Sequence, residues 1–301
     1  MKISAIICTH NRAAYLPQAI RSLLEQRLPP EDYEILVVDN NSTDNTREIV
    51  TGLMREAPNL RYFYETNAGL SCARNRGIRE AGAPIVAFLD DDALAEDGWL
   101  VAILDAFAIE PRPACVGGPV RPWWEMPKPN WFPASLLGCH DRDYGPHAHW
   151  CNYPVEQPIG CNMAFWKQAV VEVGGFDVRL NKYNDETELI RRIVLAGGGI
   201  FYQPDAGVRH LVAKERLRLG WQLKRHYYEG ISQAVAAQCE ASPRRLTRAR
   251  QLAGNLFWLT RQSARLVLSR VAMTHRIQRA TDLSRSLGTA VYLAKSLCHK
   301  K

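Results

Sequence analysis

The sequence predicts an α/β protein with a mostly parallel central sheet. Short apolar segments alternate with amphipathic stretches through the first 90 residues, and this alternation is typical of strands joined by helical crossovers. The apolar segments indicate strands that are covered on both faces. A chain of 301 residues that is 47% hydrophobic is long enough to bury one large core and to carry an appended segment.

The first part of the chain predicts strands and helices in strict alternation. The helix expected at 14–26 carries Leu16, Ile20 and Leu23 at helical spacing. Turn and N-cap residues at 40–46 precede the next helix. In chain order we expect a strand at 3–8, a helix at 14–26, a strand at 34–39, a helix ending near 56, a strand at 60–64, a helix at 72–80 and a strand at 85–89.

The later part of the chain is expected to complete the same sheet. Prolines and tryptophans crowd residues 117–160, and we expect little regular structure there, either as a wall of a binding cleft or as a rigid loop on the core. After this segment we expect a strand at 159–165, a helix at 167–173 that ends at Gly174-Gly175, a helix opening at 184–189, and sheet strands at 200–203 and 208–210.

Polar residues follow three of the predicted strands directly. They are the segment 9–12, the pair Asp39-Asn40, and the acidic triplet Asp90-Asp91-Asp92. Ligands of open α/β sheets gather outside the carboxyl ends of the strands, so the three groups are expected to converge on one nucleotide site. Adjacent carboxylates repel one another, and a divalent cation or a solvated turn would relieve this repulsion. The triplet therefore indicates either a metal and phosphate site or a solvated acidic turn.

Cysteine usage and the N-terminus favour the cytoplasm. Eight cysteines are scattered without a Cys-x-x-Cys pair, which favours reduced thiols over a disulfide framework. The apolar N-terminal stretch is too short for a signal peptide, and no apolar run is long enough to span a bilayer. Cysteines and histidines at 139–151 could bind zinc, but their spacing matches no zinc pattern, and a substrate-pocket loop is the favoured interpretation.

The basic charge of the chain lies in its C-terminal part. Residues 242–301 hold thirteen Lys or Arg and one acid, a net charge of +12, so residues 1–241, with 25 basic and 30 acidic residues, carry −5. Apolar residues recur at helical spacing between 246 and 271. Such a helix either lies on an anionic membrane surface or packs on the acidic part of the chain. Nucleic-acid binding is disfavoured because no nucleic-acid motif accompanies the charge.

Six segments in register resemble the inverting, nucleotide-sugar-dependent glycosyltransferases of family 2, which have the GT-A fold. The resemblance covers about the first 210 residues. The order of predicted elements places the end of the catalytic domain near Ala213, giving a domain at 1–213, and the charge and apolar spacing predict a basic amphipathic helical extension at 214–301. The matching segments are 6–12 (IICTHNR), 37–44 (VVDNNSTD), 73–77 (ARNRG), 88–92 (FLDDD), 173–177 (VGGFD) and 185–189 (DETEL).

The resemblance implies how the nucleotide is held. Thr9 is expected to lie against it, with Asn11 and Arg12 beside Thr9. Asp39 is expected to accept a hydrogen bond from the base, which suits the ring N–H of a uracil-type edge. Arg74 is expected to help hold the nucleotide.

The resemblance divides the acidic triplet into three roles. Asp90 is expected to hold the ribose, Asp91 the donor sugar, and Asp92 a Mg²⁺ or Mn²⁺ ion that stabilises the diphosphate leaving group. In some relatives a histidine near the position of His210 joins the metal or the diphosphate, and a structural histidine is the alternative for this residue.

Inverting transfer needs a general base for the acceptor hydroxyl. In the family an acidic pair, usually Glu then Asp, opens the helix after the Gly-Gly-Phe-Asp turn; here the order is Asp185-Glu186. By position we expect Glu186 to be the base and keep Asp185 as the alternative. Without the resemblance, both could simply be acids that stabilise a helix N-terminus.

The expected function is transfer of a sugar from a nucleoside diphosphate donor, of UDP type, to a glycan or lipid-linked acceptor in surface polysaccharide or glycolipid synthesis. The expected place is the cytoplasm or the cytoplasmic face of the membrane. A nucleotidyltransferase is the alternative enzyme, but residues 9–12 lack the glycines of a phosphate loop. A non-catalytic sugar-nucleotide-binding protein would have lost the acids that this chain keeps.

Overall fold

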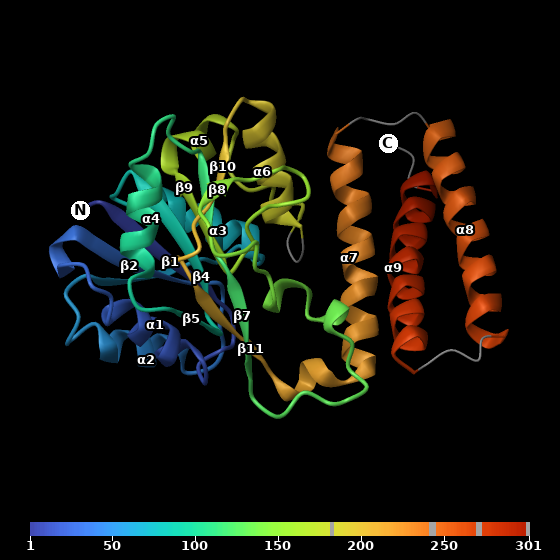
Figure 1. The fold of residues 1–301 in the computed structure, drawn as a ribbon, viewed down its shortest axis with the longest axis horizontal. Helices are drawn as coiled ribbons and strands as arrows, with labels where there is room; N and C mark the ends of the chain where they lie inside the picture. The colour runs from blue at the N-terminus through green and yellow to red at the C-terminus, as the bar shows by residue number, and fades with distance from the viewer. Residues whose placement is uncertain (181–183, 241–244, 269–272, 299–301) are drawn as a thin grey trace. The chain divides into compact units, whose positions relative to one another are not determined.

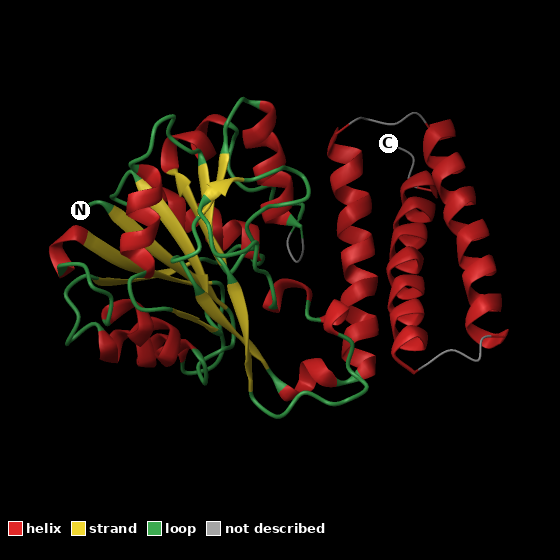
Figure 2. Ribbon diagram, viewed as in Figure 1, coloured by secondary structure: helices red, strands yellow, loops and turns green. Residues whose placement is uncertain are grey.

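The computed structural model describes residues 1–180, 184–240, 245–268 and 273–298. The chain forms two compact units. The sheet unit comprises Met1–Trp123, Cys139–Asn181 and Asp185–Leu211, and the helical unit comprises Trp124–Gly138, Lys182–Asn184 and Val212–Lys301. Each unit has its own secondary structure (Figures 1 and 2).

A large sheet forms the centre of the sheet unit. Within the described residues it has eight strands in the order β3-β2-β1-β4-β9-β6-β10-β8. Strands β3, β2, β1 and β4 are parallel, whereas β9 runs antiparallel to both of its neighbours. The strands are β1 (Ile3–Thr9), β2 (Tyr33–Asp39), β3 (Leu60–Tyr64), β4 (Ile85–Asp90), β6 (Cys115–Gly117), β8 (His149–Trp150), β9 (Asn162–Trp166) and β10 (Ile200–Tyr202).

The register of the parallel strands brings the polar strand ends to one edge. Thr9 pairs with Asp39, and Cys8 pairs with Asp90. The carboxyl ends of β1, β2 and β4 therefore meet, as the sequence predicted from the positions of their polar residues.

Helices cover both faces of the large sheet and bury two apolar cores. One core joins α1, α2 and α4 to side chains such as Ile3 and Ile35; the other joins α3, α5 and α6 to the alternate side chains, such as Ile6 and Leu36. Successive strand residues point to opposite faces, so the uninterrupted apolar segments serve both cores. The helices are α1 (Leu16–Leu24), α2 (Thr46–Leu53), α3 (Leu70–Glu80), α4 (Trp99–Phe107), α5 (Lys167–Glu172) and α6 (Asp185–Leu195).

A second, small sheet corrects two expectations. Residues 208–210 were expected in the large sheet, but β11 (Val208–Val212) lies between β5 (Ala93–Ala95) and β7 (Val120–Trp124). The physical reason is that β5 follows the acidic triplet and offers β11 an antiparallel partner. Residues 117–160 are also more regular than expected, because they contain β7 and β8.

In the part that the structure describes, the helical unit contains three long helices, α7 (Leu219–Glu240), α8 (Arg245–Leu268) and α9 (Met273–Cys298). Helices α7 and α9 approach closely, because a Cβ atom on Gly230 would meet the Arg285 carbonyl oxygen and one on Gly288 would meet that of Tyr227. Across the described residues, no helix combines the length and the apolar character needed to cross a bilayer.

Short 3₁₀ turns occur in both units, at Pro30–Asp32, Ala134–Leu136, Gly138–His140 and Lys214–Leu217.

Candidate functional site

The acidic triplet lies where β4 ends, next to Thr9 at the end of β1 and Arg12 in the loop after it. Thr9 donates a hydrogen bond from its hydroxyl to Asp91 (Oγ1 to Oδ2, 2.7 Å). The Arg12 guanidinium lies 3.5 Å from Asp92. Asp91 and Asp92 are buried, with 9% and 4% of their surface exposed. Asp91 and Asp92 therefore do not form a solvated acidic turn, in which carboxylates would face water, whereas 35% of the Asp90 side chain is exposed.

The small sheet brings His210 to the triplet. His210 pairs in register with Ala93, the residue after Asp92. Its Nε2 atom lies 3.0 Å from Asp92 Oδ1 and 3.9 Å from Asp90 Oδ2. The ring also stacks on His140, with 4.2 Å between the centroids. Packing and hydrogen bonding thus fix the imidazole beside two carboxylates.

A candidate metal site is present at this point. Donor atoms of Asp90, Cys161 and His210 lie within 4.8 Å of one another, and Asp92 is in contact with His210. Carboxylates suit Mg²⁺ and Mn²⁺, and an imidazole suits transition metals. The residues present therefore fit a divalent ion of the kind predicted from the sequence.

Arg74 connects the triplet to the acidic pair on α6. Its guanidinium lies 2.7 Å from Asp185, 3.8 Å from Asp90 and 3.9 Å from Glu186. It also donates to the carbonyl oxygen of Gly160 at 3.3 Å, and only 3% of its side chain is exposed. Burial alone would lower the pKa of Arg74, but Asp185, Asp90 and Glu186 raise it above its ordinary value.

The two acids at the start of α6 lie in different environments. Asp185 is 1% exposed and accepts hydrogen bonds from Arg74 and Ser71. Glu186 is less constrained, with 21% of its side chain exposed. Burial, and then the neighbouring charge of Asp185, raise the pKa of Glu186 to about 8. A carboxylate with such a pKa is well matched to taking up a proton near neutral pH.

The other groups of the triplet region also have shifted pKa values. Burial, and then the charge of Asp92, raise the pKa of Asp91 to about 7. Burial alone would lower the pKa of His210, but Cys161 and Asp92 raise it well above its ordinary value. Such shifts are typical of functional sites, where charges of one sign are crowded together.

Asp39 and Asn11 lie at the same sheet edge but outside this cluster of contacts. The carboxylate of Asp39 accepts the Ser42 backbone N–H at 2.9 Å and the Tyr62 hydroxyl at 2.7 Å. Asn11 bonds the loop after β2, where its side chain accepts the backbone N–H of Thr43 at 2.8 Å. These residues form a second group. It is adjacent to the triplet because Thr9, which pairs with Asp39, also donates a hydrogen bond to Asp91.

Sequence reasoning missed Cys161 and Tyr62. Tyr62 belongs to no motif. Its place near the end of β3, which pairs with β2 up to Asp39, was the only signal that could have predicted its contact with Asp39. Cys161 reaches the site because β9 runs antiparallel beside β4 and pairs Asn162 with Leu89. The sequence alone does not reveal this pairing.

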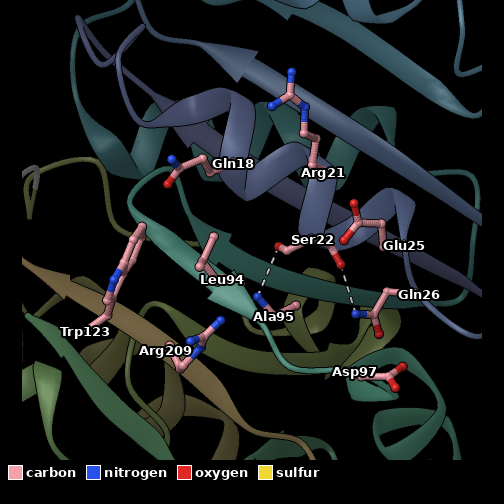
Figure 3. Close-up of a pocket in the computed structure, with 10 residues that line it drawn as sticks. All are labelled: Gln18, Arg21, Ser22, Glu25, Gln26, Leu94, Ala95, Asp97, Trp123 and Arg209. Atoms are coloured by element: carbon pink, nitrogen blue, oxygen red, sulfur yellow. Dashed lines mark hydrogen bonds between the residues drawn. The ribbon is translucent and has the colours of Figure 1, made fainter.

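A hollow of about 480 Å³ lies elsewhere in the sheet unit and contains none of the predicted site residues. Figure 3 shows it between α1 and the small sheet, with Trp123, Leu94 and Arg209 on one side and Gln18 on the other. Strand side chains alternate, so Arg209 faces this hollow and His210 faces the metal donors. The candidate site and the hollow therefore use opposite faces of β11.

Acids at the carboxyl ends of parallel strands, with an acidic pair at the start of a later helix, agree with the GT-A fold that the sequence resemblance implied. The sequence model of glycosyl transferase family 2 matches residues 4–170, more than half of the chain. The chain belongs to this family, as its six motifs predicted.

Two curated relatives align with most of the chain. A glucosyl-dolichyl phosphate glucuronosyltransferase from Haloferax volcanii is 29% identical over 78% of this chain and 77% of its own length. The succinoglycan biosynthesis protein ExoM from Rhizobium meliloti is 28% identical over 74% of this chain and 71% of its own length.

Solved structures confirm the fold. The mannosyltransferase PcManGT from Pyrobaculum calidifontis, in complex with GDP-Man and Mn²⁺, has a TM-score of 0.58 at 17% identity, over 100% of this chain and 76% of its own. TarS residues 1–349 from S. aureus, in complex with UDP-GlcNAc, has a TM-score of 0.59 at 16% identity, over 94% and 71%. The predicted GT-A fold is thus confirmed.

Replacing Arg74 with methionine is expected to destabilise the chain strongly. The substitution keeps an unbranched stem but removes the guanidinium, so Asp185 and Asp90 lose their cation, and breaking such a buried ion pair costs about 3–5 kcal/mol. Urea unfolding of the full chain measures the loss. Arg76→Ala is the matched control, because Arg76 forms a partly exposed pair with Glu80 on the same helix, worth less than about 1 kcal/mol. If Asp185→Asn in the Arg74→Met background recovered no stability, the unpaired acid would not be the cause.

Proposed function

We propose that this chain is an inverting glycosyltransferase that moves a sugar from a UDP-type nucleotide sugar to an acceptor hydroxyl. The observation that carries the proposal is the convergence of the acidic triplet, Arg74 and the Asp185-Glu186 pair around one point. One set of acids faces the position of a diphosphate, and the other offers a proton acceptor. A single in-line displacement at the anomeric carbon needs both groups at once.

The environment of Asp39 supports a uracil-type base. Its two oxygens already accept hydrogen bonds from Ser42 and Tyr62, and these donors hold the carboxylate in one orientation. A carboxylate oxygen has two lone pairs, so each oxygen can still accept a ring N–H. In this proposal Thr9, Asn11, Arg12 and Arg74 hold the rest of the nucleotide.

The candidate metal ligands are proposed to stabilise the diphosphate leaving group through a bound ion. Asp92 and His210, with Asp90 beside them, would hold a Mg²⁺ or Mn²⁺ ion. When bound, this ion stabilises the negative charge that develops on the leaving diphosphate. Asp91 holds the donor sugar in this proposal, and its hydrogen bond from Thr9 orients it.

Glu186 is the better candidate for the general base. Arg74 and Ser71 occupy Asp185, whereas Glu186 lies farther from the cation and is more exposed. Asp185 therefore acts as a positioning residue that fixes Arg74 and the start of α6. Glu186 takes the proton from the acceptor hydroxyl as that oxygen attacks the sugar.

The acceptor is proposed to be a glycan or a lipid-linked saccharide, with residues 1–213 as the catalytic domain and 214–301 as an extension that binds the cytoplasmic membrane surface. The names of the two curated relatives, which refer to a dolichyl phosphate and to succinoglycan, support this class of acceptor. In α8, Leu256 and Phe257 are 50% and 69% exposed, with Trp258 beside them. Exposed apolar side chains on a basic helix are typical of interfacial binding.

Asp92→Asn is expected to lower sugar transfer about 100-fold or more, as loss of a group that stabilises charge in the transition state does. Nucleotide release from the donor, measured with added Mn²⁺, gives the rate. A chelator should lower the wild-type rate to a similar level. Asp97→Asn is the control, because Asp97 lies five residues further on in an exposed pair with Arg27. Equal turnover in Asp92→Asn and wild type would overturn the metal assignment.

The rate constant kcat is expected to rise with pH until about 8. The pKa of Glu186 is raised to about 8, and a base must be unprotonated to act, so kcat should fall about tenfold per pH unit below that value. Glu186→Gln should abolish this rise of kcat with pH and lower the rate by about 10²–10⁴-fold. Glu188→Gln, in the same helix turn, should keep the rise. If kcat still rose with pH in Glu186→Gln, the base would be another group.

The chain is expected to float with vesicles that contain phosphatidylserine and to stay behind with vesicles of phosphatidylcholine alone. Each basic residue near an anionic surface contributes about 1 kcal/mol, and buried apolar side chains add to this. The double variant Leu256→Ser/Phe257→Ser should bind more weakly. Leu195→Ser, which removes a 73% exposed leucine from the sheet unit, is the control. No flotation of the wild-type chain would contradict the membrane proposal.

A further inference from the structure

Cys161 lies among the metal donors although no motif includes it. It directly precedes β9, whose first residue, Asn162, pairs with Leu89 on β4. Continuing this antiparallel register places Cys161 beside Asp90. The thiol is 1% exposed, and its Sγ atom, the His210 imidazole and an Asp90 oxygen lie within 4.8 Å of one another.

Three different kinds of donor thus meet at one point: a carboxylate oxygen, an imidazole nitrogen and a sulfur. A buried cysteine alone usually acts as a small apolar side chain. Cys161 differs because its Sγ atom lies within 4.8 Å of donor atoms of His210 and Asp90, and His210 itself contacts Asp92 at 3.0 Å. The thiol therefore lies at the boundary between one apolar core and this polar group.

We propose that Cys161 is a ligand of the metal site and that the site therefore favours thiophilic divalent ions over Mg²⁺. This inference rests on the proposed metal site of the glycosyltransferase, and it disfavours Mg²⁺, one of the two ions proposed there. A sulfur ligand selects softer ions such as Zn²⁺, Co²⁺ and Cd²⁺, whereas a site made of oxygen atoms alone suits Mg²⁺. On binding, the thiol loses its proton to solvent and the thiolate coordinates the ion.

Cobalt(II) titration tests the proposal, because a thiolate bound to Co²⁺ gives a near-ultraviolet charge-transfer absorption that oxygen and nitrogen ligands do not give. The probe is CoCl₂, added to the full chain under reducing conditions with and without UDP. We expect the band to appear with one equivalent of Co²⁺ and to be absent in Cys161→Ser. Cys8→Ser is the matched control, since Cys8 pairs with Asp90 from the opposite neighbouring strand, and it should keep the band.

Competition between ions gives a second readout. In the wild-type chain Zn²⁺ should displace Co²⁺ readily and Mg²⁺ poorly, and the preference for Zn²⁺ over Mg²⁺ should fall at least tenfold in Cys161→Ser. Circular dichroism of each variant establishes that it is folded. Asp92→Asn should weaken binding of both ions without removing the band.

Each other outcome overturns the inference. Co²⁺ binding without the band would show that sulfur is not a ligand, and a band that persists in Cys161→Ser would assign it to another cysteine. Absence of Co²⁺ binding would exclude this metal site altogether. The proposed glycosyl transfer is tested separately by nucleotide release with Mn²⁺, so the thiol ligand can fail while that activity stands.

Discussion

The buried guanidinium of Arg74 is the interaction on which the site depends. It is a single cation, 3% exposed, that faces acids from two other elements: Asp90 from β4, and Asp185 and Glu186 from α6. Without it, burying these carboxylates together would cost several kcal/mol each. Gly160 contributes as well, because a Cβ atom there would lie 2.6 Å from the Arg74 guanidinium. The cation thus permits acids from β4 and α6 to lie close together.

The small sheet makes the second half of the site. Strand β5 continues directly from the acidic triplet, and β11 returns beside it, so His210 arrives next to Asp92 through main-chain pairing. Neighbouring side chains of β11 point to opposite faces. His210 faces the candidate metal donors, and Arg209 lines the hollow beside α1. The position of the imidazole is thereby fixed by backbone hydrogen bonds as well as by its own contacts.

Local patterns predicted the parts of the fold that depend on local physics. The strand at 60–64 has the predicted bounds, and β1, β2 and β4 each differ by one residue, because continuous apolar segments end where polar residues begin. Pairing across long separations was not predictable from pattern alone. The sheet that takes β11, the antiparallel course of β9 beside β4, and hence the arrival of Cys161 at the metal donors depend on contacts between segments far apart in sequence. The sequence motifs indicated the acids and Arg74 of the candidate site. The pairing of strands far apart in sequence determined that Cys161 also lies there.

The central claim is that these converging acids carry out nucleotide-sugar chemistry. The most direct measurement is nucleoside diphosphate release from a panel of UDP-, GDP- and dTDP-sugars, with Mn²⁺ and a saccharide acceptor mixture, and with the anomeric configuration of the product read by NMR. We expect release from UDP-sugars above the other donors, dependence on the metal, and a product whose anomeric configuration is opposite to that of the donor. Release of no nucleotide from any donor, or a product that keeps the donor's configuration, would contradict it.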